Sequence, residues 1–337
     1  MGALTTQDLD AEIFPADDWP CDPRPFLPEA DWTVVPLVKK GAVERVTELV
    51  RGGGFDLFFN LCDGAADEGT PGIEVVETLE RLGVPFTGAT SEYYEPTREE
   101  MKAACRRAGI ATPAHVLARN ADDVERAAEE LSFPMFVKHH SSYASVGLSR
   151  ASRVQSPAGL RRQARKIMSR FGAALIEEYI GGIECTVLVA ENPDDPRNPT
   201  TYIPMQYRFP DGESFKHSDM KWVDYDAMAC FPVEDPGLAE RLRNDSARFF
   251  VEVRGASFGR CDIRVDASGT PYMLEINPNC GVYYPPSDPG SADLCLAKDP
   301  AGHEGFTRQI VAAAFARHGS KPPGLNGFST AGACRGA

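Results

Sequence analysis

Residues 258–277 carry the pattern that most constrains how this chain folds. Charged side chains at Arg260, Asp262 and Arg264 alternate with apolar residues, and this alternation predicts a strand with one polar and one buried face. A second alternating run begins after Ser268–Gly269, a pair that is typical of a two-residue hairpin turn. The sequence therefore predicts a β-hairpin in this region.

The predicted hairpin brings two carboxylates together. A two-residue turn places Asp262 opposite Glu275. The same register places Arg260 opposite Asn277, on a face that Met273 is also expected to share. Like charges that face each other destabilise a sheet, and a divalent cation such as Mg²⁺, which accepts carboxylate and amide oxygens, would offset the repulsion. A solvated polar face on an edge hairpin is the simpler alternative.

Length and charge set the broad class of the chain. Its 337 residues favour two or three compact units, and 42% hydrophobic and 25% charged residues are ordinary values for a folded protein. A net charge of -14 argues against nucleic acid or an anionic membrane as a partner. The sequence has no apolar run of membrane-spanning length, no signal-peptide pattern and no C-x-x-C motif. We expect a cytoplasmic protein with reduced thiols.

Strand and helix patterns alternate in the first part of the chain, which is typical of a parallel α/β sheet. The expected elements are strands at 33–38 and 55–60 and helices at 43–51 and 72–82. Residues 1–32 show little periodicity, so we expect there an irregular arm or a degenerate edge of the first domain.

The rest of the chain predicts an α+β arrangement. A helix is expected to begin at a capping box formed by Thr97 and Glu100 and to end at Gly109. Besides the hairpin, strands are expected at 114–118, 135–139, 148–154, 175–179, 184–190 and 201–207. Further helices are expected at 122–131, 157–171, 237–253 and 303–317. The expected units are a first domain at 1–95, a central subdomain at 96–183, a C-terminal subdomain with the metal site at 184–318 and a flexible tail at 319–337.

Several motifs in order make the sequence resemble a known family. Gly259-Arg260-Cys261-Asp262 is followed by Leu274-Glu275-Ile276-Asn277 and then by Gly281. These segments resemble the metal signature of the ATP-grasp superfamily, and the likeness over residues 55–316 is to its D-alanine:D-alanine ligase branch. The resemblance implies an ATP-grasp fold, α+β in the nucleotide-binding half, with an N-terminal parallel-sheet domain of the preATP-grasp type.

The resemblance assigns roles to residues of the hairpin and of the turn that follows it. It implies that Asp262, Glu275 and Asn277 hold two Mg²⁺ ions, with Mn²⁺ as an alternative, which bridge the phosphates of ATP. Arg260 and the backbone amide of Gly281 would stabilise the tetrahedral intermediate of the reaction.

The resemblance also implies an ATP-binding set. Lys102 and Lys138 stand where the family binds ATP phosphates, a role that suits a point charge on a flexible stem, and Lys221 stands where a lysine closes over the γ-phosphate. Taken singly, each is more simply explained as a surface lysine. The other implied ATP-binding residues belong to the phosphate-covering loop and to the adenine and ribose segment: Ser145, Val146, Gly147, Glu177, Glu178, Tyr179, Ile180 and Glu184.

The substrate side departs from the ligase pattern. The glutamate that contacts the first D-alanine in the family has no counterpart in residues 1–40, and Pro286 replaces a serine of the family. Ala144 and Trp222 replace its loop serine and its tyrosine. Aromatic residues here would suit a bulkier acceptor, with simple packing as the alternative. The candidate substrate residues are Glu68, Trp222, Tyr283, Tyr284 and Ser287.

The implied reaction joins a carboxylate to an amine through an acyl phosphate, with release of ADP and phosphate. Positioning and electrostatics would carry the catalysis, so no Ser-His-Asp triad is needed. We expect small-molecule carboxylate and amine substrates other than D-alanine, and the resemblance also allows a homodimer. The alternatives are D-alanine:D-alanine ligation in cell-wall synthesis and, in another class, a non-catalytic ATP-binding protein.

Overall fold

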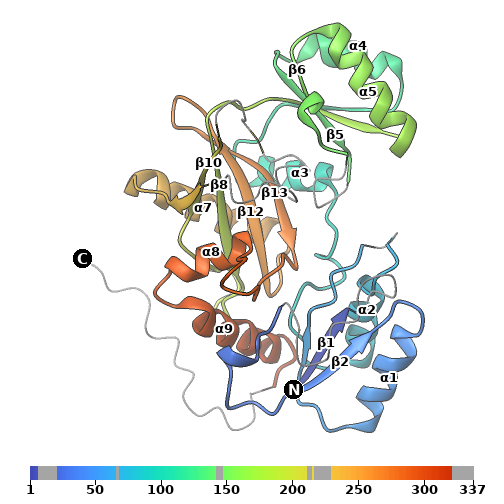
Figure 1. Ribbon diagram of the computed structural model, residues 1–337, viewed down its shortest axis with the longest axis vertical. Helices are drawn as coiled ribbons and strands as arrows, with labels where there is room; N and C mark the ends of the chain where they lie inside the picture. The colour runs from blue at the N-terminus through green and yellow to red at the C-terminus, as the bar shows by residue number, and fades with distance from the viewer. Residues whose placement is uncertain (7–20, 66–67, 142–146, 211–214, 216–228, 321–337) are drawn as a thin grey trace.

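Three β-sheets follow one another along the long axis of the molecule (Figure 1). The computed structural model describes residues 1–6, 21–65, 68–141, 147–210, 215 and 229–320. A three-stranded sheet lies at one end, a four-stranded sheet at the other and a six-stranded sheet between them. None of the described helices has the length and apolar character that crossing a bilayer requires.

The N-terminal sheet is parallel and has the order β2-β1-β3. Its strands are β1 (Gly2–Thr6), β2 (Thr33–Leu37) and β3 (Phe58–Asn60), and its helices are α1 (Ala42–Gly52) and α2 (Ile73–Leu82). The expected α/β alternation is confirmed. The expectation of an irregular arm is wrong for β1, which is the central strand. A strand that is buried throughout gives no alternating pattern, and Gly2, Ala3, Leu4 and Thr5 are all buried.

The four-stranded sheet is antiparallel and has the order β4-β7-β5-β6. The strands are β4 (His115–Ala118), β5 (Met135–His139), β6 (Arg153–Val154) and β7 (Ala174–Glu178). The helices α4 (Ala121–Glu130) and α5 (Pro157–Phe171) pack on it and form a separate core with it. A strand expected over 148–154 is reduced to β6, because the 3₁₀ turn Arg150–Ser152 occupies the middle of that span.

The six-stranded sheet has the order β11-β10-β8-β12-β13, with β9 paired to β8. The strands are β8 (Ile183–Ala190), β9 (Thr200–Thr201), β10 (Met205–Arg208), β11 (Ala229–Pro232), β12 (Phe258–Val265) and β13 (Pro271–Pro278). The remaining helices are α3 (Arg98–Ala108), α7 (Pro236–Glu252), α8 (Ser291–Lys298) and α9 (Gly302–Arg317). The span expected as one strand over 201–207 is divided between β9 and β10, and α8 was not expected.

Helix α3 shows how local sequence sets an element that serves the site. The capping box of Thr97 and Glu100 is present, and Gly109 ends the helix in the left-handed conformation, as predicted. The buried apolar side chains of α3 join the core that the N-terminal sheet and the six-stranded sheet share. The four-stranded sheet has a separate core, formed by residues 116–176. The domain bounds expected from the sequence stay predictions.

The β12–β13 hairpin has the predicted pairing but not the predicted turn. Asp262 lies opposite Glu275, and Arg260 lies opposite Asn277. The turn, however, is a three-residue loop over 267–269, closed by a 3.0 Å hydrogen bond from the Asp266 amide to the Thr270 carbonyl. The extra loop residue shifts the pairing by one position near the turn. A β-bulge, at the step from Ile263 to Asp262, restores the predicted pairing farther from the turn.

Leu274 is the extra residue at this bulge. It has no partner on β12, because Ile263 pairs with Met273 whereas Asp262 pairs with Glu275. The bulge turns Met273 into the buried core, so the expectation that Met273 shares the polar face is wrong. Leu274 takes that place beside Glu275. The backbone of Met273 bonds instead to the Ala111 carbonyl at 2.8 Å and to the Thr112 hydroxyl at 2.9 Å.

Candidate active site

Two cavities meet at the end of the β12–β13 hairpin. The hairpin cavity has a volume of about 160 Å³ and lies between the hairpin and the four-stranded sheet. The acidic cavity has a volume of about 490 Å³ and lies between the turn that follows β13 and the N-terminal unit. Arg260, Asn277 and Ser291 line both cavities, so a group bound in one lies next to a group bound in the other.

The hairpin cavity collects most of the residues to which the sequence assigns ATP and metal binding. They come from strands β5, β7, β8, β12 and β13 and from the turn between β7 and β8: Lys138, Glu177, Glu178, Tyr179, Ile180, Glu184, Asp262, Glu275 and Asn277. Arg260, predicted to be catalytic, lines the same cavity. Phe136, Phe215 and Leu274 add apolar surface. The rings of Phe136 and Phe215 lie near that of Tyr179. The cavity thus combines apolar and aromatic surface with charged groups, a lining suited to a phosphorylated aromatic ligand.

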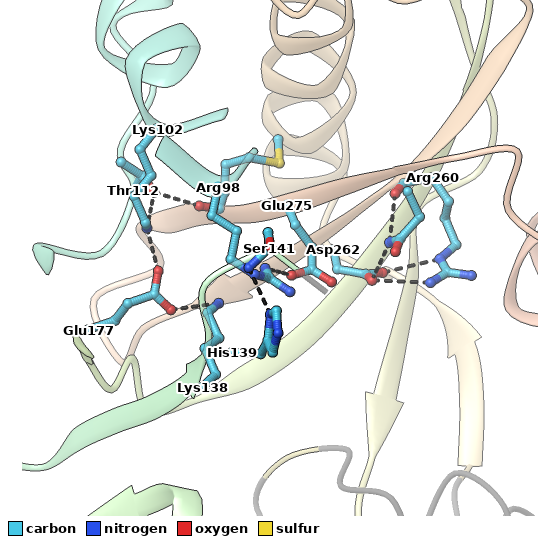
Figure 2. A network of polar contacts seen from close by, with 12 residues as sticks. Arg98, Lys102, Thr112, Lys138, His139, Ser141, Glu177, Arg260, Asp262 and Glu275 are labelled. Carbon is cyan, nitrogen blue, oxygen red and sulfur yellow. Dashed lines mark hydrogen bonds and ion pairs between the residues drawn. The ribbon is translucent and has the colours of Figure 1, made fainter. Parts of the chain in front are cut away.

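One carboxylate joins the two predicted phosphate-binding lysines (Figure 2). Glu177 lies 2.5 Å from the Lys102 ammonium and 2.6 Å from the Lys138 ammonium, and all three side chains are buried. Burial alone would raise the pKa of Glu177, but the two lysine charges outweigh it and hold that pKa far below its usual range. Glu177 thus holds the lysines in place, whereas the sequence places it with the adenine and ribose segment.

Lys138 is the member of this group that lines the hairpin cavity. Its pKa is lowered, first by burial and then by the nearby charge of Arg98. Lys102 lies behind it, where its ammonium also donates to the Thr112 hydroxyl at 3.1 Å. The interpretation of these residues as ordinary surface lysines is wrong, because neither ammonium is on the surface.

The three expected metal ligands face one another. Asp262 accepts hydrogen bonds from Arg260 at 3.1 and 3.2 Å and from the Asn277 amide at 2.9 Å. Glu275 accepts from Arg98 (Figure 2). Within the described part of the chain, no group of three or more His, Cys, Asp or Glu side chains could enclose a metal by itself. Two carboxylates and one amide are a donor set that fits Mg²⁺, which draws further oxygens from water and phosphates.

Two arginines of the site were missed. Arg98 is the first residue of α3 and reaches across to Glu275. Arg264 is buried on β12, where it pairs with Glu184 at 3.2 Å and bonds the Ile180 carbonyl at 3.0 Å. Its alternation with the other charged residues of β12 was a usable signal. Arg98 gave none, because only the tertiary packing of α3 on β13 brings it to the hairpin.

The acidic cavity has a strongly biased lining. Four carboxylates line it, namely those of Asp63, Glu68, Glu95 and Asp288. Arg260 is the one cationic side chain among the described residues that line it, and its guanidinium already pairs with Asp262. Solvent reaches Asp63 through the cavity, yet burial among protein atoms and the charge of Glu68 raise its pKa to about 6.

The turn after β13 separates the predicted substrate residues. Gly281 and Tyr284 line the acidic cavity, and a Cβ on Gly281 would lie 2.5 Å from the Tyr284 ring. Tyr283 instead points into the core, where its hydroxyl lies 2.9 Å from that of Thr307, so its placement at the substrate is wrong. Ser287 is exposed and lines neither cavity.

Several predicted residues cannot be placed in the site. Ser145, Val146, Lys221 and Trp222 lie outside the described residues. Gly147 is described, but a Cβ there would lie 3.2 Å from the Phe171 ring, and the residue does not line either cavity.

Comparison with known proteins adds a family to this geometry. Residues 105–284, which span the four-stranded sheet and both strands of the hairpin, match the model of the D-ala D-ala ligase C-terminus family. The chain belongs to this family. The expected ligase-like branch of the ATP-grasp enzymes is thereby confirmed.

Individual relatives of this chain share less than a third of its residues over the aligned regions. An uncharacterised protein of Sinorhizobium fredii is 29% identical over 233 residues, which cover 66% of this chain and 64% of that protein. The chain thus spans less than two thirds of that relative's length. A D-alanine–D-alanine ligase of Laribacter hongkongensis is 27% identical over 237 residues, covering 69% of this chain and 72% of the relative.

Solved structures agree on the fold. The D-alanine–D-alanine ligase of Bacillus anthracis, solved with ATP, has a TM-score of 0.66 at 19% identity and covers 94% of this chain and 97% of its own. The VanG D-Ala:D-Ser ligase of Enterococcus faecalis has a TM-score of 0.61 at 15% identity, covering 78% and 74%. The ATP-grasp fold expected from the sequence is confirmed.

Proposed function

We propose that this protein is an ADP-forming carboxylate-amine ligase. The observation that carries the proposal is the junction of the two cavities at Arg260 and Asn277. A nucleotide in the hairpin cavity would present its γ-phosphate at this junction, where Arg260 would attract the carboxylate substrate, and the amine would approach from the acidic cavity. Two substrates bound side by side in this way could react with each other directly, and the enzyme would need no side-chain nucleophile.

The residues around the hairpin cavity have separate roles in this proposal. Asp262, Glu275 and Asn277 would hold Mg²⁺, which when bound would neutralise phosphate charge. Lys138, backed by Glu177 and Lys102, supplies a buried cation for the phosphates, and burial strengthens its attraction to them. Tyr179 and Phe136 offer apolar surface to the base. Arg260 and Gly281 both line the acidic cavity. The Arg260 guanidinium and the Gly281 backbone amide would stabilise the negative charge that develops on the attacked carboxyl group.

The lining of the acidic cavity supports an amine substrate that carries a further positive charge. Four carboxylates repel an anionic acceptor and attract a cationic one. Alanine has no second cationic group, and it would leave most of the cavity unfilled. The printed names of several relatives favour D-alanine itself as the competing substrate.

The test is phosphate release from ATP and Mg²⁺ with pairs of carboxylic acids and amines. We expect release to require both partners and to be fastest when the amine is a diamine or a basic amino acid. Release with D-alanine alone at a comparable rate would favour the dipeptide-ligase alternative. Tight ATP binding without release for any pair would contradict the proposal and favour a non-catalytic role.

Glu275→Gln supplies the catalytic control for this assay. It keeps the size of the side chain but removes the negative charge that would help hold Mg²⁺, so we expect turnover to fall by about 100-fold or more. Glu252→Gln is the matched control, because Glu252 pairs with Arg107 on the surface and lines neither cavity. Near-normal turnover of the Glu275 variant would contradict the metal assignment.

A further inference from the structure

The residue before β12 and the turn after β13 are tied to the N-terminal unit by two hydrogen bonds, each from a backbone amide to a side chain. The Gly88 amide donates to the Ser257 hydroxyl at 3.0 Å, and the Ala89 amide donates to Oδ1 of Asn279 at 2.7 Å. Gly88 and Ala89 are buried. The two consecutive N–H groups are therefore held by side chains that lie 190 and 169 positions away along the chain.

Both of the side chains that accept these bonds sit on unusual backbone. Ser257 has φ 58° and Asn279 has φ 47°, in the left-handed region that non-glycine residues seldom adopt. Such conformations persist where the surrounding structure holds them. Two such residues converge on Gly88–Ala89, and the two hydrogen bonds that they accept from this dipeptide form a clamp.

Gly88 permits this close approach. It has φ 97°, and a Cβ there would lie 3.0 Å from Oδ1 of Asn279. Glycine adopts this backbone without strain and leaves room for the Asn279 side chain.

Asn279 lies midway between two groups that the reaction would use. It follows the metal-site residue Asn277 by two positions and precedes Gly281 by two, and all three line the acidic cavity. On the opposite side, Tyr94 and Glu95 of the cavity wall come soon after Ala89 in the chain. The bond between Asn279 and Ala89 therefore links the turn that carries Gly281 to the segment that leads to Tyr94 and Glu95.

We infer that Asn279 is a positioning residue. Its hydrogen bond to Ala89 holds the Tyr94–Glu95 side of the acidic cavity against the turn that carries Gly281. The inference rests on the proposed function for its effect on substrate. It acts through Ala89 and the Gly281 backbone, without requiring that Asn279 touch the reacting groups.

The test uses the full-length protein and two independent measurements. Asn279→Gly removes the acceptor while tolerating positive φ, so we expect amide exchange at Ala89 and in the Tyr94–Glu95 segment to become about tenfold faster. We also expect KM for the amine to rise about tenfold, with KM for ATP unchanged within twofold. Asn279→Asp keeps an acceptor of the same size and should restore slow exchange at Ala89.

Asn192→Gly is the matched control, because the Asn192 side chain also accepts from a backbone amide, that of Asp194, and donates to the Asn198 carbonyl, in a surface turn outside both cavities. It should leave exchange at Ala89 unchanged. Unchanged exchange in Asn279→Gly would overturn the clamp. Equal rises in both KM values together with a lowered Tm would assign Asn279 a structural role only. If the wild type ligates no substrate pair, the proposed function fails, and exchange at Ala89 and Tyr94–Glu95 still decides whether the clamp holds the wall.

Discussion

At the scale of single residues, Glu177 is the carboxylate that allows two lysines to be buried beside the site. It is buried between Lys102 and Lys138 and neutralises one of the two positive charges. Burying charges is costly unless each has a partner, and removing one partner leaves an uncompensated charge in a low-dielectric setting. The same arrangement leaves a net positive charge beside the hairpin cavity, where a polyanion would bind.

Glu177→Gln should therefore destabilise the protein by about 3–5 kcal/mol at pH 7. Because the folded-state pKa of Glu177 lies below its unfolded value, the carboxylate stabilises the fold above about pH 4–5, and this contribution is lost as the pH falls through the folded pKa. The difference in denaturation midpoint between variant and wild type should thus begin to shrink below about pH 4–5 and should continue to shrink as the pH falls toward the folded-state pKa.

Glu125→Gln is the control for this series. Glu125 pairs with Arg161 on the surface, where ion pairs are screened by solvent, so the variant should unfold like the wild type at each pH. A loss of stability in Glu177→Gln that does not change with pH would contradict the electrostatic explanation.

At the scale of elements, the bulge in β13 shapes the hairpin cavity. It turns Met273 into the core and adds Leu274 to the cavity lining without disturbing the opposition of Asp262 and Glu275. Bulges re-aim side chains in this way next to functional sites. An apolar group is thereby placed beside the charged ones, where the base of a nucleotide would lie.

Leu274→Ala should weaken ATP binding while leaving the fold intact. The side chain is half-buried in the cavity wall, and loss of part of its apolar contact is worth about 1 kcal/mol, or about fivefold in Kd. Calorimetric titration with ATP and Mg²⁺ measures the effect. Leu131→Ala, a partly buried leucine in the separate core of the four-stranded sheet, should leave the Kd unchanged; an equal loss there would remove the special role of Leu274.

At the scale of the whole molecule, Arg317 joins α9 to both neighbouring units. Its guanidinium pairs with Glu191, which follows β8, and donates to the Phe86 carbonyl of the N-terminal unit at 2.7 Å. Glu191 is buried and also accepts from the Ser257 amide at 2.9 Å. The Arg317–Glu191 ion pair and the clamp at Gly88–Ala89 thus lie close together, and both connect the N-terminal sheet to the six-stranded sheet.

Arg317→Ala should cost about 3 kcal/mol in unfolding free energy, because it leaves the Glu191 carboxylate buried without its cation. Chemical denaturation followed by tryptophan fluorescence measures the change. Arg308→Ala provides the comparison, since its partners Glu29 and Glu304 are more exposed, with 39% and 65% of their side chains accessible, and it should cost less than about 1 kcal/mol. Equal costs for the two variants would mean that burial of Glu191 does not decide the strength of this link.

The sequence by itself determined the features that depend on local periodicity and on motif order. Alternation placed Arg260 and Asp262 on one face of β12, capping chemistry marked both ends of α3, and the order of motifs pointed to the ATP-grasp ligases. These features could be predicted because neighbouring residues decide them. The central strand β1 gave no signal, since a strand buried on both faces has no polar alternation to read.

Only the tertiary structure decided which distant groups meet. It brought Arg98 to Glu275, enclosed Lys102 with Lys138 around one carboxylate, turned Tyr283 away from the acidic cavity and set Asn279 against Ala89. Each of these contacts depends on how helices and sheets pack over long separations in the chain, and residue type alone does not encode that packing. The bulge at Leu274 belongs here too, because the bonds that Ala111 and Thr112 make with Met273 complete it.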